Sequence, residues 1–338
     1  MAPSLARNVL APKRRYSARA ALPLAVAFAI ITATGGATPS SGAKPTRQTP
    51  GVTAVRVLES EPRSTRSSAA PAPVRIAAAG DIACESPYTV TRFTCRHGAT
   101  ARLISSRSVD AVLPLGDTQY ASGQRTDYES SYAPTWGVFK GRTYPVIGNH
   151  EYGDPDARGF LSYFGARVPT RRVWYASNLG AWRVYVLNSN CNQVSCAAQV
   201  RWLKKDLVAH PRRCSLAAMH HPRFSSGEHG DSQWAAQFWP ALDAHQVDLV
   251  LAGHDHDYER FAPRHSSGAI AANGLRSFVV GTGGKSLYSF TTVEAGSRFR
   301  YARRAGVLFL SLRHRSYTWR YRTTNGTVLD SGSANCLR

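Results

Sequence analysis

The chain has 338 residues, 43% of them hydrophobic, and a formal net charge of +21. This hydrophobic content excludes a chain too polar to fold, and the length allows one large domain or two small ones. Residues 75–338 hold 32 basic and 19 acidic residues, which leaves a net charge of +13. A basic domain attracts phosphate esters, nucleic acids or anionic cell-wall polymers, although the same charge can simply keep a protein soluble.

The first 37 residues predict a secretory signal peptide. Basic residues between Arg7 and Arg19 precede the apolar stretch 20–33, and small residues follow it. The stretch is short for a membrane span, so we expect cleavage near Ala37, with an uncleaved anchor as the alternative. The pair Arg14-Arg15 leaves the general and the twin-arginine export routes open. We therefore expect a secreted or extracellular protein with no membrane span after cleavage.

Residues 38–73 are rich in Pro, Ser, Thr and Ala and show no sustained apolar period. This composition predicts a disordered linker, so the folded domain is expected to span residues 74–338.

The cysteine content indicates disulfides. Six cysteines is an even number in a chain with an export signal, and no paired C-x2-C spacing favours zinc. Six cysteines allow 15 pairings, which the sequence does not resolve. Short loops favour Cys84 with Cys95 and Cys191 with Cys196, which leaves Cys214 with Cys336.

Strand-like and helix-like segments alternate through the first two thirds of the domain. Apolar runs stop at polar loops at residues 74–79, 111–115, 144–147, 182–187, 215–219 and 247–252. Helical patterns occur at residues 99–106, 157–164, 196–209 and 232–245. Continuous apolar runs of this length are typical of strands covered on both faces, so the alternation predicts a layered α/β domain.

The C-terminal part has a different pattern. Strand-like segments follow one another at residues 277–280, 307–313, 317–322 and 327–329, with a hairpin turn at Asn325-Gly326. We expect them to form a second, more antiparallel sheet that packs on the first one within the same domain.

Polar residues with metal-ligand chemistry follow the predicted strands. They are Asp81, Asp117, Asn149, His220 and His254, and a glycine precedes all of them except His220. Each one alone is explained by an ordinary turn or loop. Their order, carboxylate, carboxamide and imidazole at successive strand ends, favours one shared site, because ligands bind where the carboxyl ends of strands converge.

These residues belong to five blocks whose order resembles the calcineurin-like metallophosphoesterases, and more narrowly the purple acid phosphatases. The blocks are Gly80-Asp81, Gly116-Asp117-Thr118-Gln119-Tyr120, Gly148-Asn149-His150-Glu151, His220-His221-Pro222 and Gly253-His254-Asp255-His256, and the resemblance spans residues 74–331. Together with the strand pattern it implies an α/β four-layer αββα sandwich, in which two mixed sheets pack face to face with helices outside.

The resemblance implies a site with two metal ions. Asp81, Tyr120 and His256 match ligands of the first ion, Asp117 matches the carboxylate that bridges both ions, and Asn149, His220 and His254 match ligands of the second. Many relatives in the wider family have a histidine where this chain has Ala83. This chain lacks that histidine and has Tyr120 three residues after Asp117. The first site is therefore rich in anionic oxygen and suits Fe(III), while the second suits divalent Fe, Zn or Mn.

The resemblance also implies proton donors and a reaction. His150 matches a histidine that acts on the phosphoryl group or the leaving group, and His229 matches a substrate-side histidine by its spacing. We expect an exported, acid phosphatase-like enzyme that hydrolyses phosphate monoesters of small molecules by attack of metal-bound hydroxide, without specific nucleic-acid recognition. The segment Gly281-Thr282-Gly283-Gly284-Lys285 lacks P-loop spacing and is interpreted as a turn.

Two alternatives remain open at this stage. One is a phosphodiesterase that acts on nucleotides or anionic cell-wall polymers with the same metal pair. The other is a non-catalytic protein that binds polyanions. The sequence leaves the natural substrate and the oligomeric state undetermined.

Overall fold

The computed structural model describes residues 72–290 and 292–338, so the predicted signal peptide and residues 38–71 of the predicted linker lie outside it. The described residues belong to one compact unit. None of the described helices is long and apolar enough to cross a membrane.

A five-stranded mixed sheet joins the two ends of the domain. Its order is β12-β11-β10-β1-β2. β1 (Val74–Ala79) pairs in parallel with β2 (Ala111–Pro114) and antiparallel with β10 (Gly306–Leu312). β11 (Ser316–Thr323) and β12 (Val328–Asn335) continue the antiparallel side. The start of the domain is therefore held by strands from its end.

A seven-stranded mixed sheet forms the second layer, in the order β3-β4-β5-β6-β8-β7-β9. β4, β5, β6 and β8 are parallel, and β3, β7 and β9 pair antiparallel at the two sides. The strands are β3 (Tyr175–Leu179), β4 (Trp182–Val186), β5 (Cys214–Ala218), β6 (Leu249–Ala252), β7 (Tyr258–Phe261), β8 (Arg276–Val280) and β9 (Ser297–Tyr301).

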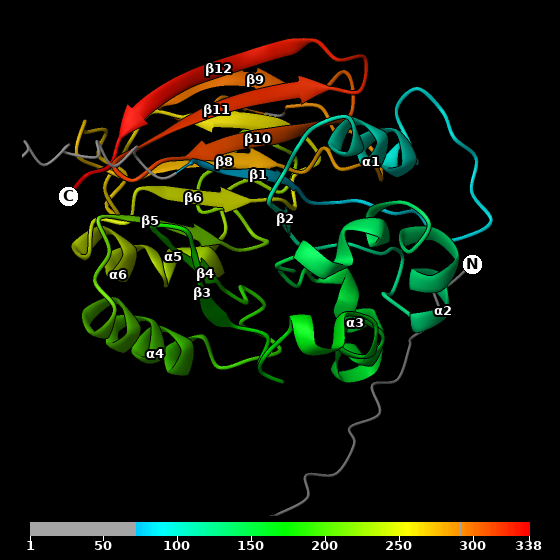
Figure 1. Cartoon of the computed structure of the whole chain (residues 1–338), viewed down its shortest axis with the longest axis horizontal. Coiled ribbons are helices and arrows are strands. Elements are labelled where there is room, and N and C mark those ends of the chain that lie inside the picture. The colour runs from blue at the N-terminus through cyan, green and yellow to red at the C-terminus, as the bar shows by residue number, and fades with distance from the viewer. Residues whose placement is uncertain (1–71, 291) are drawn as a thin grey trace, which may run out of the picture. The chain divides into compact units, whose positions relative to one another are not determined.

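Helices lie outside the two sheets. Figure 1 shows α4, α5 and α6 beyond the seven-stranded sheet, with α1 beside the five-stranded sheet. The helices are α1 (His97–Ser105), α2 (Arg125–Asp127), α3 (Arg158–Phe164), α4 (Cys196–Ala209), α5 (Gln233–Ala236) and α6 (Trp239–Ala244). Two sheets enclosed by helices agree with the predicted α/β sandwich.

Strand periodicity explains why the central strands of the seven-stranded sheet, such as β4, are buried on both faces. In β4, Val184 and Val186 join the core between the sheets, whereas Tyr185 and its neighbour Leu187 pack with α4 and α6. Alternate residues of a strand point to opposite faces, so a strand between two apolar layers must be apolar throughout. Burial of each such side chain contributes about 1.5–3 kcal/mol.

The membership of the C-terminal strands differs from our expectation. We predicted that the strands after residue 277 would form a sheet of their own. Instead, β8 pairs in parallel with β6, and β10 pairs with β1. An apolar run predicts a strand but carries no information about a partner more than 200 residues away. The predicted second sheet is therefore confirmed for β10, β11 and β12, whereas residues 277–280 belong to the other sheet and β1 and β2 complete this one.

Two local predictions were also wrong. Residues 144–147 make an isolated bridge between Val146 and Leu115 but no strand, and Pro145 has no amide to donate to a ladder. The helix predicted over 232–245 is broken into α5 and α6, with Pro240 in the first turn of α6. The helix predicted over 196–209 is confirmed as α4.

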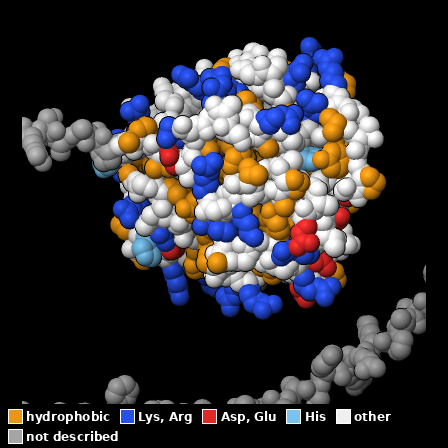
Figure 2. All heavy atoms as spheres, turned by 45° about the vertical axis from the view of Figure 1, so that its right-hand side comes forward, with side chains coloured by type: hydrophobic (Ala, Val, Ile, Leu, Met, Phe, Trp, Pro, Cys, Tyr) orange, Lys and Arg blue, Asp and Glu red, His pale blue; other side chains and the backbone are white. Residues whose placement is uncertain are grey.

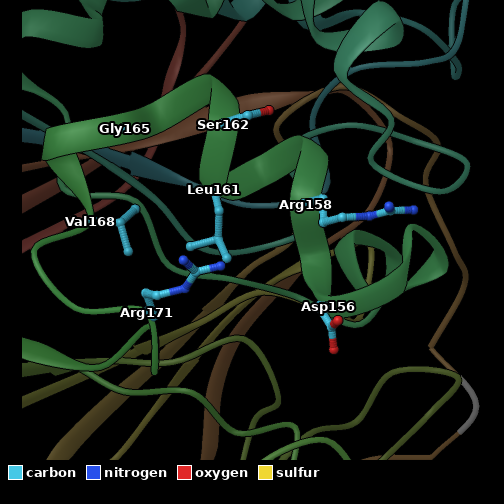
Figure 3. A pocket seen from close by; sticks show the side chains of 7 residues that line it. All are labelled: Asp156, Arg158, Leu161, Ser162, Gly165, Val168 and Arg171. Atoms are coloured by element: carbon cyan, nitrogen blue, oxygen red, sulfur yellow. The ribbon is translucent and has the colours of Figure 1, made fainter.

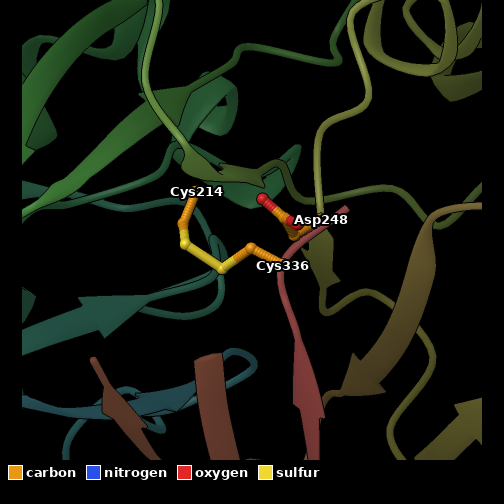
Figure 4. A group of neighbouring side chains, drawn as sticks. All are labelled: Cys214, Asp248 and Cys336. Carbon is orange, nitrogen blue, oxygen red and sulfur yellow. A yellow bond between two sulfur atoms is a disulfide. The ribbon is translucent and has the colours of Figure 1, made fainter. Parts of the chain in front are cut away.

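The three disulfides join the predicted pairs, Cys84–Cys95, Cys191–Cys196 and Cys214–Cys336. Asp248 lies against the third (Figure 4) and accepts hydrogen bonds from the amides of Ser215, at 2.7 Å, and Leu337, at 2.6 Å. Burial raises the pKa of Asp248 to about 6 despite these bonds. Because both sulfurs are in a disulfide, this group offers no thiolate to a metal.

Candidate metal centre

Three of the predicted ligands sit where the backbone turns sharply at the end of a strand. Asp81 follows β1 with φ of 60°, Asp117 follows β2 with φ of 45°, and His254 follows β6 with φ of 73°. Non-glycine residues rarely adopt this left-handed conformation, which costs of order 1 kcal/mol or more and is found mainly where function demands it. The turns direct all three side chains into the same crevice.

The glycines before these ligands provide space more than conformational freedom. Gly116 has φ of +87°, but Gly148 has no such conformation. A Cβ on Gly148 would lie 2.1 Å from the Oδ1 atom of Asp117, and one on Gly116 would lie 2.4 Å from the ring of His220. Any side chain at these two positions would therefore displace a predicted ligand.

One group of predicted ligands surrounds the phenol of Tyr120, and we call Asp81, Tyr120 and His256 the oxygen-rich group. The Tyr120 hydroxyl lies 2.9 Å from Asp81 Oδ1 and 3.0 Å from both Asp117 Oδ2 and His256 Nε2. A single hydroxyl proton serves only one of these atoms at a time. The four converging atoms therefore leave electron pairs that suit a cation.

The charge around Tyr120 also requires a cation if the phenol is to ionise. Burial, followed by the negative charges of Asp117 and Asp81, raises the pKa of Tyr120 well above its usual value. The protein alone keeps this phenol protonated. A phenolate at this position is therefore consistent only with a strongly Lewis-acidic ion beside it.

The second group, which we call the nitrogen-rich group, contains Asn149, His220 and His254. His220 Nε2 lies 3.1 Å from Asn149 Oδ1 and 3.3 Å from His254 Nδ1. The other ring nitrogen of His220 lies 2.9 Å from the carbonyl oxygen of Leu115, to which it donates when protonated. This hydrogen bond orients the ring so that Nε2 faces the other ligands and can bind a metal that displaces its proton, as is usual for metal-binding histidines.

Asp117 lies between the two groups. Its Oδ2 atom is 3.0 Å from the Tyr120 hydroxyl and 3.4 Å from His220 Nε2. Burial opposes ionisation of Asp117, but the charge and hydrogen bond of His220 hold its pKa far below the usual value, while the pKa of His220 rises to about 10. The ligand atoms of Asp81, Asp117 and His220 all lie within 4.8 Å of one another. The donors present thus fit two ions that share one carboxylate.

The two predicted proton donors lie at the mouth of the crevice, on different sides. The ring of His150 packs 4.3 Å from that of Tyr120, with Nε2 3.8 Å from Asp117 Oδ2 and Nδ1 2.6 Å from the carbonyl oxygen of Ala121. The ring of His229 stacks on His254 at 4.4 Å. All the residues predicted for the site are therefore brought together.

A pocket of about 410 Å³ opens beside the nitrogen-rich group, with Asn149, His221, His229, Trp234 and His254 in its wall. Burial lowers the pKa of His221 to about 3, so this imidazole stays neutral, with Nδ1 2.8 Å from the Ser189 hydroxyl. This pocket is the space next to the candidate centre in which a substrate can be held.

A pocket of about 710 Å³ lies on α3 and the segment after it. Figure 3 shows its lining side chains, which include Arg158, Leu161 and Arg171 but none of the predicted metal ligands. The larger of these two pockets is therefore not the one beside the candidate centre.

Glu151, for which no role was predicted, lies between the loops that carry the predicted ligands. Its buried carboxylate accepts hydrogen bonds from the amides of Gly148 at 2.6 Å, Asp117 at 3.0 Å and Thr118 at 2.6 Å. Burial and the charge of Asp117 raise its pKa. Its place directly after Asn149-His150 was the available signal, but an acid in a loop is usually solvated.

Lys285 was interpreted as part of a turn, and the structure supports the turn while adding a charge. Its amide donates to the carbonyl oxygen of Asp81 at 2.9 Å, so this amide is not free to bind phosphate. Its Nζ atom lies 4.8 Å from the centre of the Tyr120 ring and 3.0 Å from Glu85 Oε2. Lys285 therefore places a positive charge above the oxygen-rich group.

The arrangement agrees with comparisons against known proteins. The chain is similar to tartrate-resistant acid phosphatase type 5 of Sus scrofa, 25% identical over 242 residues (61% of this chain, 71% of the relative). It is also similar to a nucleotide pyrophosphatase/phosphodiesterase of Hordeum vulgare, 24% identical over 277 residues (69% and 74%).

Among solved structures, the purple acid phosphatase from yellow lupin (Lupinus luteus) seeds shares the fold, with a TM-score of 0.64 at 19% identity. The match covers 78% of this chain and 54% of the lupin chain, so the chain spans about half the length of that neighbour.

The family model of the calcineurin-like phosphoesterases matches residues 74–258, which is more than half of the chain. These residues hold every predicted metal ligand, and the prediction of a phosphoric ester hydrolase agrees with this match. The chain therefore belongs to the calcineurin-like phosphoesterase family.

Proposed function

We propose that the chain is an exported, acid phosphatase-like phosphomonoesterase that works with two metal ions. The observation that carries the proposal is the position of Asp117, whose carboxylate lies within 3.4 Å of both the Tyr120 hydroxyl and His220 Nε2. Two ions held by these groups would polarise a phosphate ester and lower the pKa of water, which makes hydroxide available at neutral pH. The predicted ligands are Asp81, Asp117, Tyr120 and His256 for Fe(III), and Asp117, Asn149, His220 and His254 for divalent Fe, Zn or Mn.

Side chains at the mouth would complete the reaction. His150 and His229 would hold a proton for the departing alkoxide, because a ring nitrogen of imidazole can carry a proton and release it. The contact of His150 Nδ1 with the Ala121 carbonyl oxygen directs Nε2 towards the centre. No side-chain nucleophile is required.

A separate set of observations supports the proposed export. The basic and apolar segment within residues 1–37 has the order of a signal peptide, and all six cysteines form disulfides. Disulfides persist in oxidising compartments outside the cytosol. We infer cleavage near Ala37, a linker up to residue 73 and a catalytic domain over residues 74–338.

Metal analysis, a visible spectrum and hydrolysis of p-nitrophenyl phosphate between about pH 4 and 9 test the proposal together. We expect two metals per chain and a tyrosinate-to-Fe(III) absorption band. Absence of hydrolysis by the fully metal-loaded protein would sink the proposal.

A phosphodiesterase is the second candidate, because the pocket of about 410 Å³ has room for a second ester substituent against Trp234. The rate on p-nitrophenyl phosphate is compared with that on bis-p-nitrophenyl phosphate. A faster rate on the diester would replace the monoesterase assignment.

A further inference from the structure

A second polar concavity lies on the outer face of the five-stranded sheet. This groove of about 480 Å³ is lined by Arg75, Arg107, Arg313, Arg320 and Arg322, with Phe309 in its floor, and contains none of the predicted metal ligands. We call it the arginine groove.

Strand alternation explains why the arginines gather there. In β11, Tyr317, Trp319 and Tyr321 point into the core between the sheets, so Arg320 and Arg322 must point outwards. Cross-strand pairing places Phe309 opposite Arg320. The same pairing places Arg75 opposite Ser311 of β10, and Arg107 follows the end of α1.

The positive charge of the arginine groove is poorly balanced. Within the described part of the chain, Arg75 pairs with Asp110 at 3.2 Å, and the other four arginines form no ion pair with a carboxylate. Partial burial and the charges of Arg107 and Arg320 lower the pKa of Arg322. The guanidinium groups of Arg107, Arg320 and Arg322 are therefore close enough to repel one another, and an anion that binds among them relieves this repulsion.

The spacing of the arginines suits several phosphates rather than one. Residues two apart on a strand lie about 6.7 Å apart, and β1 and β11 are separated by β10 and so lie about 9.6 Å apart. One phosphate spans only a fraction of this distance. A linear chain of phosphates can contact Arg75, Arg320 and Arg322 in turn, and guanidinium groups bind phosphate oxygens through paired hydrogen bonds.

The geometry points to a binding site for a linear phosphate polymer without bases, of the inorganic polyphosphate type. Proteins that hold single-stranded nucleic acid stack bases on exposed aromatic rings. Phe309 is the one aromatic residue in the lining, and it is partly buried between its neighbours. The floor therefore favours a chain of anions over a chain of bases. The arginine groove is separate from the metal centre, so this inference does not depend on the proposed phosphatase activity.

The test needs a control for general charge, because Figure 2 shows Lys and Arg side chains spread over one whole face of the molecule. Binding of medium-chain inorganic polyphosphate to the full chain is measured by calorimetry at several salt concentrations. The groove variant carries Arg107→Gln, Arg320→Gln and Arg322→Gln. The control variant loses the same charge at three arginines whose side chains are exposed elsewhere, Arg201 on α4, Arg213 before β5 and Arg298 on β9.

We expect the groove variant to bind at least about tenfold more weakly with a shallower salt dependence, and the control variant to change by less than about threefold. Thermal melting checks that both variants fold, and Arg320→Gln alone serves if the triple variant does not. Asp117→Asn should bind the polymer as the unchanged protein does.

Equal losses in the groove and control variants would overturn the site in favour of net charge. Tighter groove-dependent binding of a single-stranded oligonucleotide, or of vesicles with anionic lipid, would replace the assigned polymer.

Discussion

The oxygen-rich and nitrogen-rich groups share Asp117 but differ in charge and in exposure. The first adds a carboxylate and a phenol, both almost fully buried, and Lys285 and the ring of Tyr288, 4.0 Å from that of His256, lie over it. The second adds a neutral amide and two imidazoles, and Asn149 and His254 face the pocket of about 410 Å³. The closed group is therefore suited to hold a hard, highly charged ion permanently, and the open group is suited to an ion that meets the substrate.

The backbone segments that carry the oxygen-rich group connect the two sheets. These segments follow β1 and β2 of one sheet and β6 of the other. The backbone amide of His254 donates to Asp81 Oδ2 at 2.9 Å, which links the two groups directly. A substitution in one group should therefore alter metal binding in the other group most strongly when it affects a residue that both groups contact.

Removal of the shared ligand has the largest expected effect. Asp117→Asn keeps the shape but removes the charge that both groups use, so both metals should be lost, and kcat/KM should fall by about 10³-fold or more. Metal analysis and p-nitrophenyl phosphate kinetics measure this. Loss of only one metal would show that Asp117 is not shared.

His254 and His256 belong to different groups, so substituting each one tests the two predicted ion sites separately. His256→Ala should lose the ion responsible for the visible band, whereas His254→Ala should retain the band and lose the divalent ion, each with about 10²-fold lower activity. Metal content and the spectrum of each variant are compared. Loss of the same metal from both variants would contradict the assignment of His254 and His256 to different ions.

His97 lies behind the oxygen-rich side and makes folding depend on pH. Burial, with a smaller effect of the Lys285 charge, lowers its pKa from 6.5 to about 4. Between these values the unfolded chain binds a proton that the folded chain does not, so stability is lost as the pH falls from about 6.5 to 4. This loss should reach about 3 kcal/mol and should be absent from His97→Gln. Urea unfolding at pH 7 and pH 4.5 measures it. An equal decrease in the free energy of unfolding between these pH values in the two proteins would contradict the assignment.

Tyr120→Phe removes the phenol oxygen while it keeps the ring beside His150. We expect the visible band to disappear and the activity to fall by about tenfold, because Asp81, Asp117 and His256 still hold the ion. Tyr288→Phe is the matched control, since its ring stacks on His256 without belonging to the predicted ligands. An unchanged spectrum in Tyr120→Phe would remove Tyr120 from the ligand set.

The smallest expected effect concerns Lys285, the charge that only the oxygen-rich side carries. Lys285→Met should raise KM for a dianionic ester by about threefold with little change in kcat, because a partly exposed cation that is screened by solvent contributes about 1 kcal/mol or less. Glu85→Gln, which frees Lys285 from its partner, should lower KM instead. Changes of KM in the same direction in both variants would exclude this role.

The clustering of five predicted ligands could be expected from sequence because each closely follows an apolar run, and strand ends converge in α/β sheets. The other two, Tyr120 and His256, were expected only from the resemblance to the family. The left-handed φ of Asp81, Asp117 and His254 was not predictable, because these residue types also form ordinary turns. Glu151 was missed because its hydrogen bonds reach amides in two different loops. Lys285 was missed because its approach to Tyr120 depends on the fold of the 164 intervening residues.

The sheets were predicted as layers but not as pairings. Local periodicity indicates whether one face of a strand or both faces are buried, as the burial of β4 and β11 illustrates. It does not indicate that β10 adds to β1, because that contact is decided by the packing of the complete domain.

The disulfide Cys214–Cys336 sets an order of events during biosynthesis. Cys84 and Cys95 can pair once 11 residues separate them, and Cys191 and Cys196 after five, but Cys214 must wait for 122 more residues. During that interval its thiol is exposed to exchange with the pair at 191 and 196, which has emerged just before it. Truncation of the last three residues, which include Cys336, would leave Cys214 permanently in that state. In an oxidising compartment, the final residues of the chain thus decide whether the finished enzyme or a mispaired product accumulates.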